Sequence, residues 1–115
     1  MPRVSVIIPA YNSAATIGDT IASVAAQTFG DWEIVVGDDA STDETAAVAR
    51  AADPRVTVVS GTQNGGPAAG RNLAVAAAQG ELLALLDAGV NAEYGRALRE
   101  RWLCDTVMAV ATKAA

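Results

Sequence analysis

The sequence predicts an α/β protein, a Rossmann-like parallel half-sheet of about four strands with helices on both of its faces. Two observations predict this fold. Short apolar runs alternate with longer segments of helical character, the order that crossover helices impose on a parallel sheet. The runs also lack strict alternation and are mostly rich in β-branched residues, as strands buried on both faces are. The expected strands are Val4–Ile8, Glu33–Val36, Val56–Val59 and Leu82–Leu86.

The first helix is expected between the first two strands. It carries Ile17, Ile21 and Val24 at helical spacing, so these side chains share one apolar face. Ser13 precedes them and is a residue type that favours the N-cap position. We expect the helix to end before Gly30.

The second helix is expected to begin at a capping box. In this motif the Ser41 hydroxyl accepts a hydrogen bond from the N–H of Glu44, and the Glu44 carboxylate reaches back. The helix should run to about Ala52, because Asp53 and Pro54 follow and the residue before a proline is disfavoured in a helix.

The third helix is predicted from Pro67 to Gln79, with Gly80 as its C-terminal stop. The same glycine bears on the next element. The run Leu82–Leu86 is leucine-rich, so periodicity alone also allows a helix there. The short length of the run and the preceding glycine favour a strand.

Composition excludes several classes of protein. With 115 residues, 51% of them hydrophobic and 18% charged, the chain predicts one folded domain and not a disordered segment. No apolar run reaches the length of about 18 residues that a membrane span needs, and Val4–Ile8 is too short for a signal-peptide core, so we expect a cytoplasmic location. The single cysteine, Cys104, predicts neither a disulfide nor a zinc site.

Charge and the absence of histidine narrow the chemistry. The formal net charge is −5, which argues against nucleic acid as a partner. The chain has no His, so Ser-His-Asp and Cys-His catalysis and histidine metal sites are excluded. Any phosphate must therefore be met by backbone N–H groups, by one or two arginines, or by a cation that carboxylates hold.

Polar residues follow the ends of the predicted strands, where ligands bind in open α/β sheets. The turn after the first strand lacks the G-x-G-x-x-G of dinucleotide-binding domains, and no P-loop sequence is present. The residues at these ends come from four loops: Pro9, Ala10, Tyr11 and Asn12, then Asp38 and Asp39, then Gly66 and Arg71, then Asp87.

These strings together resemble the family 2 glycosyltransferases, inverting enzymes of the GT-A fold that use nucleotide-sugar donors. The resemblance covers residues 3–88 and rests on several motifs in the right order. They are Val4-Ser5-Val6-Ile7-Ile8-Pro9-Ala10-Tyr11-Asn12, Gln27-Thr28-Phe29, Asp38-Asp39-Ala40-Ser41-Thr42-Asp43, Asn64-Gly65-Gly66, Gly70-Arg71-Asn72, Gly80-Glu81 and Leu85-Leu86-Asp87-Ala88.

The resemblance implies roles for individual residues. It places the turn Pro9–Tyr11, with Ala10 between them, against the nucleotide base, and makes Asp39 the acceptor of a hydrogen bond from the base. The implied role of Gly66 is to let the chain pass the nucleotide, and that of Arg71 is to help hold it. A carboxylate only accepts hydrogen bonds, which suits a ring N–H of a pyrimidine, and a phenol offers a flat surface.

The resemblance also makes Asp87 the first residue of the D-x-D motif, which binds Mn²⁺ or Mg²⁺ at the diphosphate. Here the motif reads Asp87-Ala88-Gly89, so the second carboxylate is missing. We therefore expect metal binding to be weak or absent. The half of the family that holds the acceptor and the catalytic base has no counterpart, so no catalytic residue is assigned.

Two domains of unequal kind follow from this reading. Residues 1–88 are the predicted nucleotide-sugar-binding domain, truncated or divergent after Ala88, and residues 89–115 are a divergent helical tail starting at about Ala92. The tail carries Tyr94, Leu98 and Trp102 four residues apart, and no second set of strands is expected in it. The alternative function is a non-catalytic nucleotide-binding or regulatory module that docks a partner through this helix.

Some residues have structural interpretations beside the functional ones. Asp38 can equally serve as a strand-end group, Trp32 as core or rim packing, and Asn12 as a partner for turn backbone. The strand Leu82–Leu86 is expected to leave an uncovered sheet edge, which favours self-association.

Overall fold

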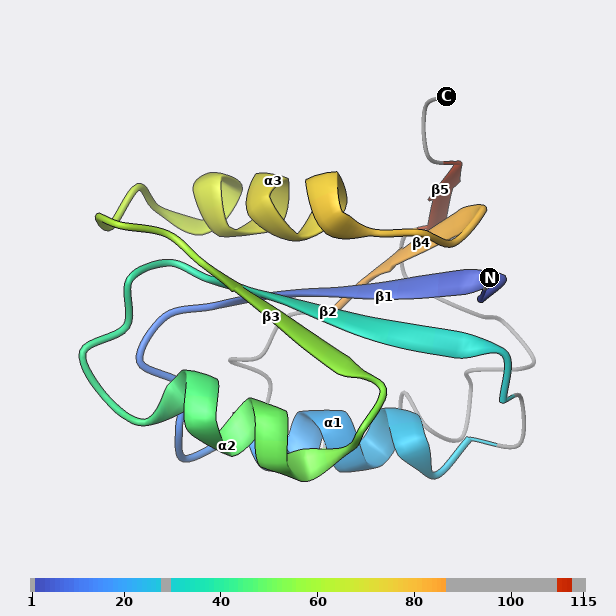
Figure 1. Ribbon diagram of the computed structural model, residues 1–115, viewed down its shortest axis with the longest axis horizontal. Helices are drawn as coiled ribbons and strands as arrows, with labels where there is room; N and C mark the ends of the chain where they lie inside the picture. The colour runs from blue at the N-terminus through green and yellow to red at the C-terminus, as the bar shows by residue number, and fades with distance from the viewer. Residues whose placement is uncertain (1, 28–29, 87–109, 113–115) are drawn as a thin grey trace.

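The structure, a computed structural model, describes residues 2–27, 30–86 and 110–112. The described residues form one sheet in the order β3-β2-β1-β4-β5, in which the first four strands are parallel (Figure 1). The α/β Rossmann-like fold is therefore confirmed. In chain order the elements are β1 Val4–Ala10, α1 Ile17–Ala25, β2 Trp32–Asp38, α2 Thr45–Ala52, β3 Val56–Ser60, α3 Pro67–Ala77, β4 Leu82–Leu85 and β5 Val110–Thr112.

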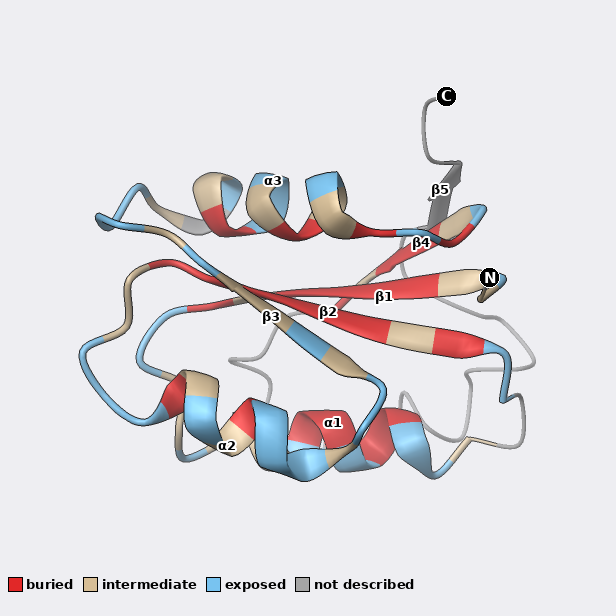
Figure 2. Cartoon of the chain, viewed as in Figure 1, coloured by how far each residue is buried: buried red, intermediate tan, exposed pale blue. Residues whose placement is uncertain are grey.

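The central strands are buried on both faces, which explains why they lack alternation in the sequence. Helices α1 and α2 cover one face of the sheet and α3 covers the other (Figures 1 and 2). Because side chains alternate along a strand, Val6 and Ile8 pack on the α1 side while Ile7 of the same strand packs on the α3 side. All three are fully buried.

Helix α3 approaches β2 closely at a pair of glycines. A Cβ added at Gly37 would lie 1.8 Å from the carbonyl oxygen of Gly70, and one added at Gly70 would lie 2.9 Å from the carbonyl oxygen of Gly37. Neither position has room for a side chain, so this contact requires glycine on both elements. It brings the N-terminal half of α3 against the carboxyl end of β2, directly beside Asp39.

Strand β1 extends two residues beyond its predicted end, because Pro9 pairs with Gly37 and Ala10 with Asp38. Pro9 and Ala10 therefore belong to the strand and not to the turn. The predicted caps of the first two helices are wrong. Helix α1 begins only at Ile17, after a turn in which the carbonyl of Ser13 accepts from the N–H groups of Thr16 and Ile17.

The predicted capping box of the second helix also does not form. Helix α2 begins at Thr45, whose N–H donates to Asp43 over 2.9 Å, and Glu44 makes no side-chain cap. The hydroxyl of Ser41 is used elsewhere, since it accepts from the N–H of Asn12. The predicted end near Ala52 is confirmed.

Helix α3 ends at Ala77, before the predicted Gln79, and Gly80 has a different role from the expected helix stop. Its N–H donates to the Ser5 hydroxyl over 2.8 Å, and an added Cβ would lie 2.7 Å from the Ser5 nitrogen. The Ser5 hydroxyl in turn donates to Glu33, which also accepts from the N–H of Gln79. The glycine thus lets the chain pass close to β1 before β4 begins.

A strand in the tail was not expected, and β5 corrects that prediction. It pairs antiparallel with β4, with Leu83 opposite Ala111, so the edge expected to stay open is paired over this stretch. Three residues are too few for a periodic pattern to reveal a strand. The predicted helix from about Ala92 lies outside the described residues. Among the helices that the structure does describe, none is long and apolar enough to cross a membrane.

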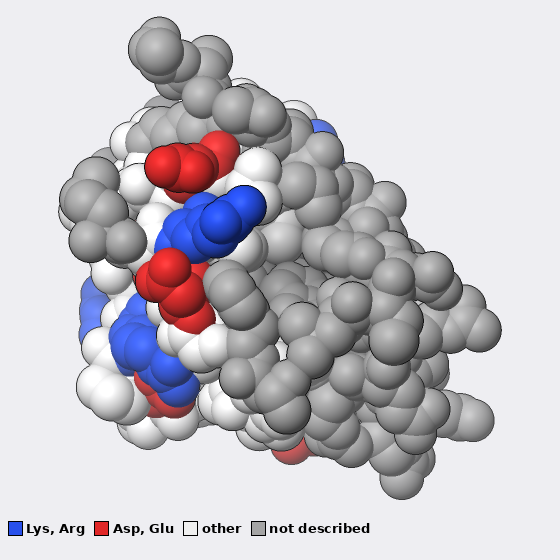
Figure 3. Space-filling model, turned by 90° about the vertical axis from the view of Figure 1, so that its right-hand side faces the viewer, with Lys and Arg blue, Asp and Glu red and all other residues white. Residues whose placement is uncertain are grey.

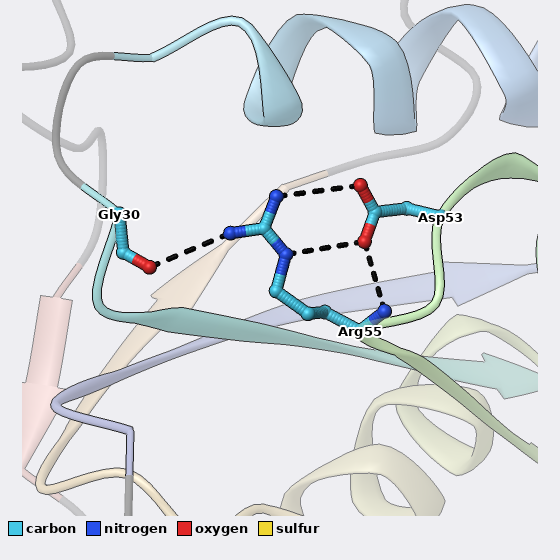
Figure 4. A network of polar contacts seen from close by, with 3 residues as sticks. All are labelled: Gly30, Asp53 and Arg55. Carbon is cyan, nitrogen blue, oxygen red and sulfur yellow. Dashed lines mark hydrogen bonds and ion pairs between the residues drawn. The ribbon is translucent and has the colours of Figure 1, made fainter.

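The amino ends of the strands carry a set of mutually paired side chains. The Arg55 guanidinium forms an ion pair of 3.1 Å with Asp53 and donates to the carbonyl of Gly30 (Figure 4). It also lies 3.5 Å from the centroid of the Trp32 ring. Trp32 is only 3% exposed, which confirms its packing role. Acidic and basic side chains alternate along the described part of this face (Figure 3).

Candidate nucleotide-binding edge

The carboxyl ends of β1, β2 and β3 meet the loop that leads into α3, on the left of Figure 1. The first link between these segments is made by backbone. The N–H of Asp39 donates to the carbonyl of Ala10 over 2.9 Å, which joins the end of β2 to the end of β1. Five predicted site residues, Pro9, Ala10, Tyr11, Asp39 and Gly66, are therefore carried by adjoining segments at one edge of the sheet.

Asp39 holds the loop before α3. The residue is 3% exposed, and its carboxylate accepts from the N–H of Gly65 over 2.9 Å with one oxygen and from that of Gly66 over 2.7 Å with the other. The amide of Asn64 donates to its backbone carbonyl over 3.4 Å. Since a carboxylate offers about four acceptor positions, each oxygen keeps capacity for another donor. The N-terminal end of α3 also favours negative charge.

The two glycines before α3 are required by geometry. Gly66 has φ of 94°, a conformation that residues with a Cβ rarely adopt. At Gly65 an added Cβ would lie 2.7 Å from that of Ala69. Both N–H groups can therefore point to the same carboxylate.

Asp38 is a strand-end group, as its structural interpretation predicted. One carboxylate oxygen accepts from the N–H of Ser41 over 3.1 Å, and the other accepts from the Ser60 hydroxyl over 3.2 Å. Its backbone carbonyl accepts from the N–H of Gly61 over 2.8 Å. Asp38 thus ties β2 to the end of β3, and both of its oxygens are already bonded within the protein.

Tyr11 stands at the end of β1 with its side chain 49% exposed, which makes it the exposed large hydrophobic residue of the described part of the chain. The next residue, Asn12, has φ of 50°, in the left-handed region. Asparagine tolerates this conformation better than most residues. The chain thus turns sharply immediately after Tyr11, the residue that follows the last residue of β1.

Contacts between the loop after β1 and the loop after β2 are the part of the site that sequence reasoning missed. Asn12 accepts from the N–H of Thr42 over 2.9 Å, and Asp43 accepts from the N–H of Ala14 over 3.2 Å. The hydrogen bond from the Thr45 hydroxyl, helped by backbone N–H groups, holds the pKa of Asp43 below its ordinary value. Short polar residues at 41–43 predict a cap for their own helix, and no local pattern shows that they also serve a distant loop.

Arg71 lies on α3, exposed, and forms no ion pair with any other residue that the structure describes. It follows Gly70, the residue that contacts β2, so the helix that carries it is fixed at this point. Asp87 lies outside the described residues. Within them there is no cluster of three or more acidic or thiol side chains that could hold a metal ion.

Comparison with known proteins identifies the family. The model of glycosyl transferase family 2 matches residues 5–90. The chain is 43% identical over 89 residues to the putative teichuronic acid biosynthesis glycosyltransferase TuaG of Bacillus subtilis, and the match covers 75% of this chain and 35% of that protein. The chain thus spans about a third of that relative's length.

Two solved structures are similar in fold. TarS 1-349 of S. aureus in complex with UDP-GlcNAc superposes with a TM-score of 0.71 at 33% identity, over 87% of this chain and 31% of that one. The mannosyltransferase PcManGT of Pyrobaculum calidifontis, in complex with GDP-Man and Mn²⁺, also gives 0.71 at 33% identity, over 90% and 33%. The edge formed by Tyr11, Asp39 and Gly66 therefore belongs to a chain that is a member of glycosyl transferase family 2.

Proposed function

We propose that this chain is the donor-binding half of an inverting glycosyltransferase and that it binds a nucleotide-diphospho-sugar at the carboxyl edge of its sheet. The observation that carries the proposal is the buried Asp39 carboxylate, held beside the end of β1 and the loop before α3. Solved structures of similar proteins in complex with UDP-GlcNAc and with GDP-Man support this class of ligand.

Each proposed contact follows from the chemistry of the group. Asp39 only accepts, so it selects a base with a ring N–H, such as uracil, against one that presents only acceptors there. The exposed ring of Tyr11 and the adjoining residues Pro9 and Ala10 offer a surface for the base. Arg71 supplies positive charge for the diphosphate, and Gly66 lets the backbone approach the ligand.

A divalent cation is the cofactor that the family implies, because it stabilises negative charge on the diphosphate leaving group. Asp87 is the proposed ligand in this chain, and Gly89 stands where a second carboxylate is expected. We propose that Mn²⁺ or Mg²⁺ adds little to nucleotide affinity here. Replacing Gly89 by Asp should make the affinity metal-dependent, and an unchanged affinity with and without Mn²⁺ in that variant would refute the role of Asp87.

Transfer of sugar needs a base within hydrogen-bond reach of the acceptor hydroxyl. We propose that the chain binds the donor and does not transfer sugar alone, with residues 1–88 as the binding domain. The runner-up is a regulatory module that docks a partner through a helix over Ala92–Ala111. Residues 92–109 lie outside the described part of the chain, and Val110 and Ala111 belong to β5 instead of a helix. The cytoplasmic location and self-association stay predictions.

Binding of UDP tests the proposal. Calorimetry should detect UDP binding to the chain at millimolar ligand, with CDP much weaker because cytosine presents an unprotonated ring nitrogen where uracil carries its N–H. Asp39→Asn should lose most of the preference for UDP while Asp31→Asn, an exposed acid at the other end of the sheet, should keep it. Equal binding of UDP and CDP, unaffected by Asp39→Asn, would refute the proposal.

A further inference from the structure

We infer that Asn12 and Asp43 are positioning residues for the proposed nucleotide site, in which they fasten the loop after β1 to the loop after β2. This inference rests on the proposed function and deepens it. Neither residue needs to touch the ligand. Their effect reaches it through Tyr11, the neighbour of Asn12, and through Asp39, which lies on the same loop as Asp43.

Asn12 makes the first half of this two-loop clamp. Its N–H donates to the Ser41 hydroxyl over 2.9 Å. Its side-chain oxygen accepts from the N–H of Thr42 over 2.9 Å and from the Thr42 hydroxyl over 3.2 Å. Backbone and side chain of one residue thus bind two consecutive residues of the other loop.

Asp43 makes the second half. One oxygen accepts from the N–H of Ala14 over 3.2 Å, across the two loops. The other oxygen accepts from the N–H and the hydroxyl of Thr45. Thr45 is fully buried, and its hydroxyl oxygen accepts from the N–H of Ser13 over 2.8 Å. The exposed carboxylate is thereby anchored on a buried residue.

Together with a backbone hydrogen bond, the clamp closes a ring of chain formed by the residues after β1 and those after β2. On the inside, the N–H of Asp39 donates to the carbonyl of Ala10. On the outside, Asn12 holds Ser41 and Thr42. The segment that carries Tyr11 and the segment that follows Asp39 are therefore joined at both ends, so the backbone of Tyr11 is held in place relative to that of Asp39.

Backbone conformation shows what the clamp must hold. Asn12 has φ of 50° and Ala40 has φ of 59°, and both lie within the ring. An L-residue such as alanine is disfavoured in this region, so its surroundings must determine the conformation. Without the clamp the two loops gain alternative conformations, and the ligand must then order them on binding, which weakens affinity.

The test separates loop fastening from nucleotide binding. Hydrogen exchange of the free chain measures fastening at the N–H groups of Asn12, Ala14 and Thr42, and calorimetry measures UDP affinity. Asn12→Gly keeps the left-handed backbone accessible but removes the side chain, and Asp43→Ala removes the carboxylate. Asp31→Ala is the control.

Each single variant is expected to bind UDP about tenfold more weakly at a temperature where the free chain stays folded. In Asn12→Gly the N–H of Ala14, which bonds to Asp43 and not to Asn12, should also exchange faster. The double variant should lose little more affinity than either single one, because the clamp acts as a unit.

Unchanged UDP affinity in both single variants would overturn the inference. So would a loss of affinity fully accounted for by unfolding, since the role would then be structural only. If the unmodified chain binds no UDP, the proposed function fails and the positioning role with it. Hydrogen exchange in the free chain would still show whether the two loops are fastened. A chain that binds no UDP can therefore be distinguished from a chain in which the clamp does not form.

Discussion

The cluster around Arg55 at the amino end of the sheet differs from the acidic residues at the carboxyl end in the partners that its side chains bind. At the amino end, Arg55 pairs with Asp53 and stacks on Trp32, so charged and aromatic groups satisfy one another. At the carboxyl end, Asp39 and Asp43 bind backbone N–H groups of neighbouring loops. At the amino end the side chains of Arg55, Asp53 and Trp32 bind one another. At the carboxyl end the two carboxylates fix the conformation of neighbouring loops.

The two ends of the sheet also differ in the side chains that they expose. The carboxyl end leaves the exposed ring of Tyr11 and the unpaired cation of Arg71 within the described part of the chain. It also contains the left-handed residues Asn12, Ala40 and Gly66. Backbone in disfavoured conformations, held by side chains, is a property that binding sites share. These differences support the carboxyl edge as the place of the proposed ligand site.

Adding a side chain at the close contact between α3 and β2 should cause the largest loss of stability. In Gly37→Ala the new Cβ would lie 1.8 Å from the Gly70 carbonyl oxygen, so α3 must move away from the carboxyl edge. We expect the free energy of unfolding to fall by about 2–3 kcal/mol, measured by urea denaturation, with loss of UDP binding. At Gly30 an added Cβ meets no atom within 4 Å, so Gly30→Ala should be nearly neutral. Equal stabilities of the two variants would contradict the packing described.

Removing the buried hydroxyl under the carboxyl edge should come next. Thr45→Val keeps the shape of the side chain but leaves Asp43 without one donor and the N–H of Ser13 without its acceptor. The expected loss in the free energy of unfolding is about 1–2 kcal/mol. Thr45→Ser, which retains the hydroxyl, should lose less of the hydrogen-bonding contribution. The interpretation fails if valine is tolerated as well as serine by thermal denaturation.

A substitution at the amino end should lower the stability of the fold less and leave the UDP affinity unchanged. Arg55→Ala removes an ion pair and a cation–π contact at an exposed side chain, and each is worth about 1 kcal/mol or less. Thermal unfolding should show a small decrease, and the UDP affinity should stay that of the unmodified chain. Arg50→Ala, a solvent-exposed arginine of α2, is the matched control for charge. A changed UDP affinity in Arg55→Ala would break the contrast between the ends.

Low pH should slightly reduce the stabilisation of the fold that an aspartate provides at each end of the sheet. Hydrogen bonds from Thr45 lower the pKa of Asp43, and those from Arg55 lower the pKa of Asp53, relative to the ordinary value of 3.8. A carboxyl whose pKa is lowered by folding stabilises the fold above its unfolded pKa, and this contribution is lost as pH falls through the folded value. Below about pH 4, the free energy of unfolding should therefore depend less steeply on pH in Asp43→Asn and in Asp53→Asn than in the unmodified chain. Identical acid dependence in all three chains would contradict the assignment.

The fold was largely predictable because its signals are local. Buried strands and amphipathic helices produce patterns among residues that are close in sequence, and these patterns predicted the parallel strands of the sheet. The missed strand β5 is too short to show a pattern, whereas the errors at Ser41 and Gly80 share one physical cause, which is that tertiary contacts use groups expected to act locally. Ser41 binds Asn12 instead of capping its own helix, and Gly80 passes Ser5 instead of ending α3. The positions of Asp39 and Gly66 were predictable from motifs, whereas the clamp joins residues about thirty positions apart.

A titration of the chain with UDP, followed residue by residue through backbone amide resonances, tests the central contrast most directly. We expect the amides of Tyr11, Gly65 and Gly66 to shift in a saturable way, while those of Glu33 and Gly80 at the amino end do not. Shifts concentrated at the amino end, or none that saturate at the carboxyl edge, would contradict this expectation.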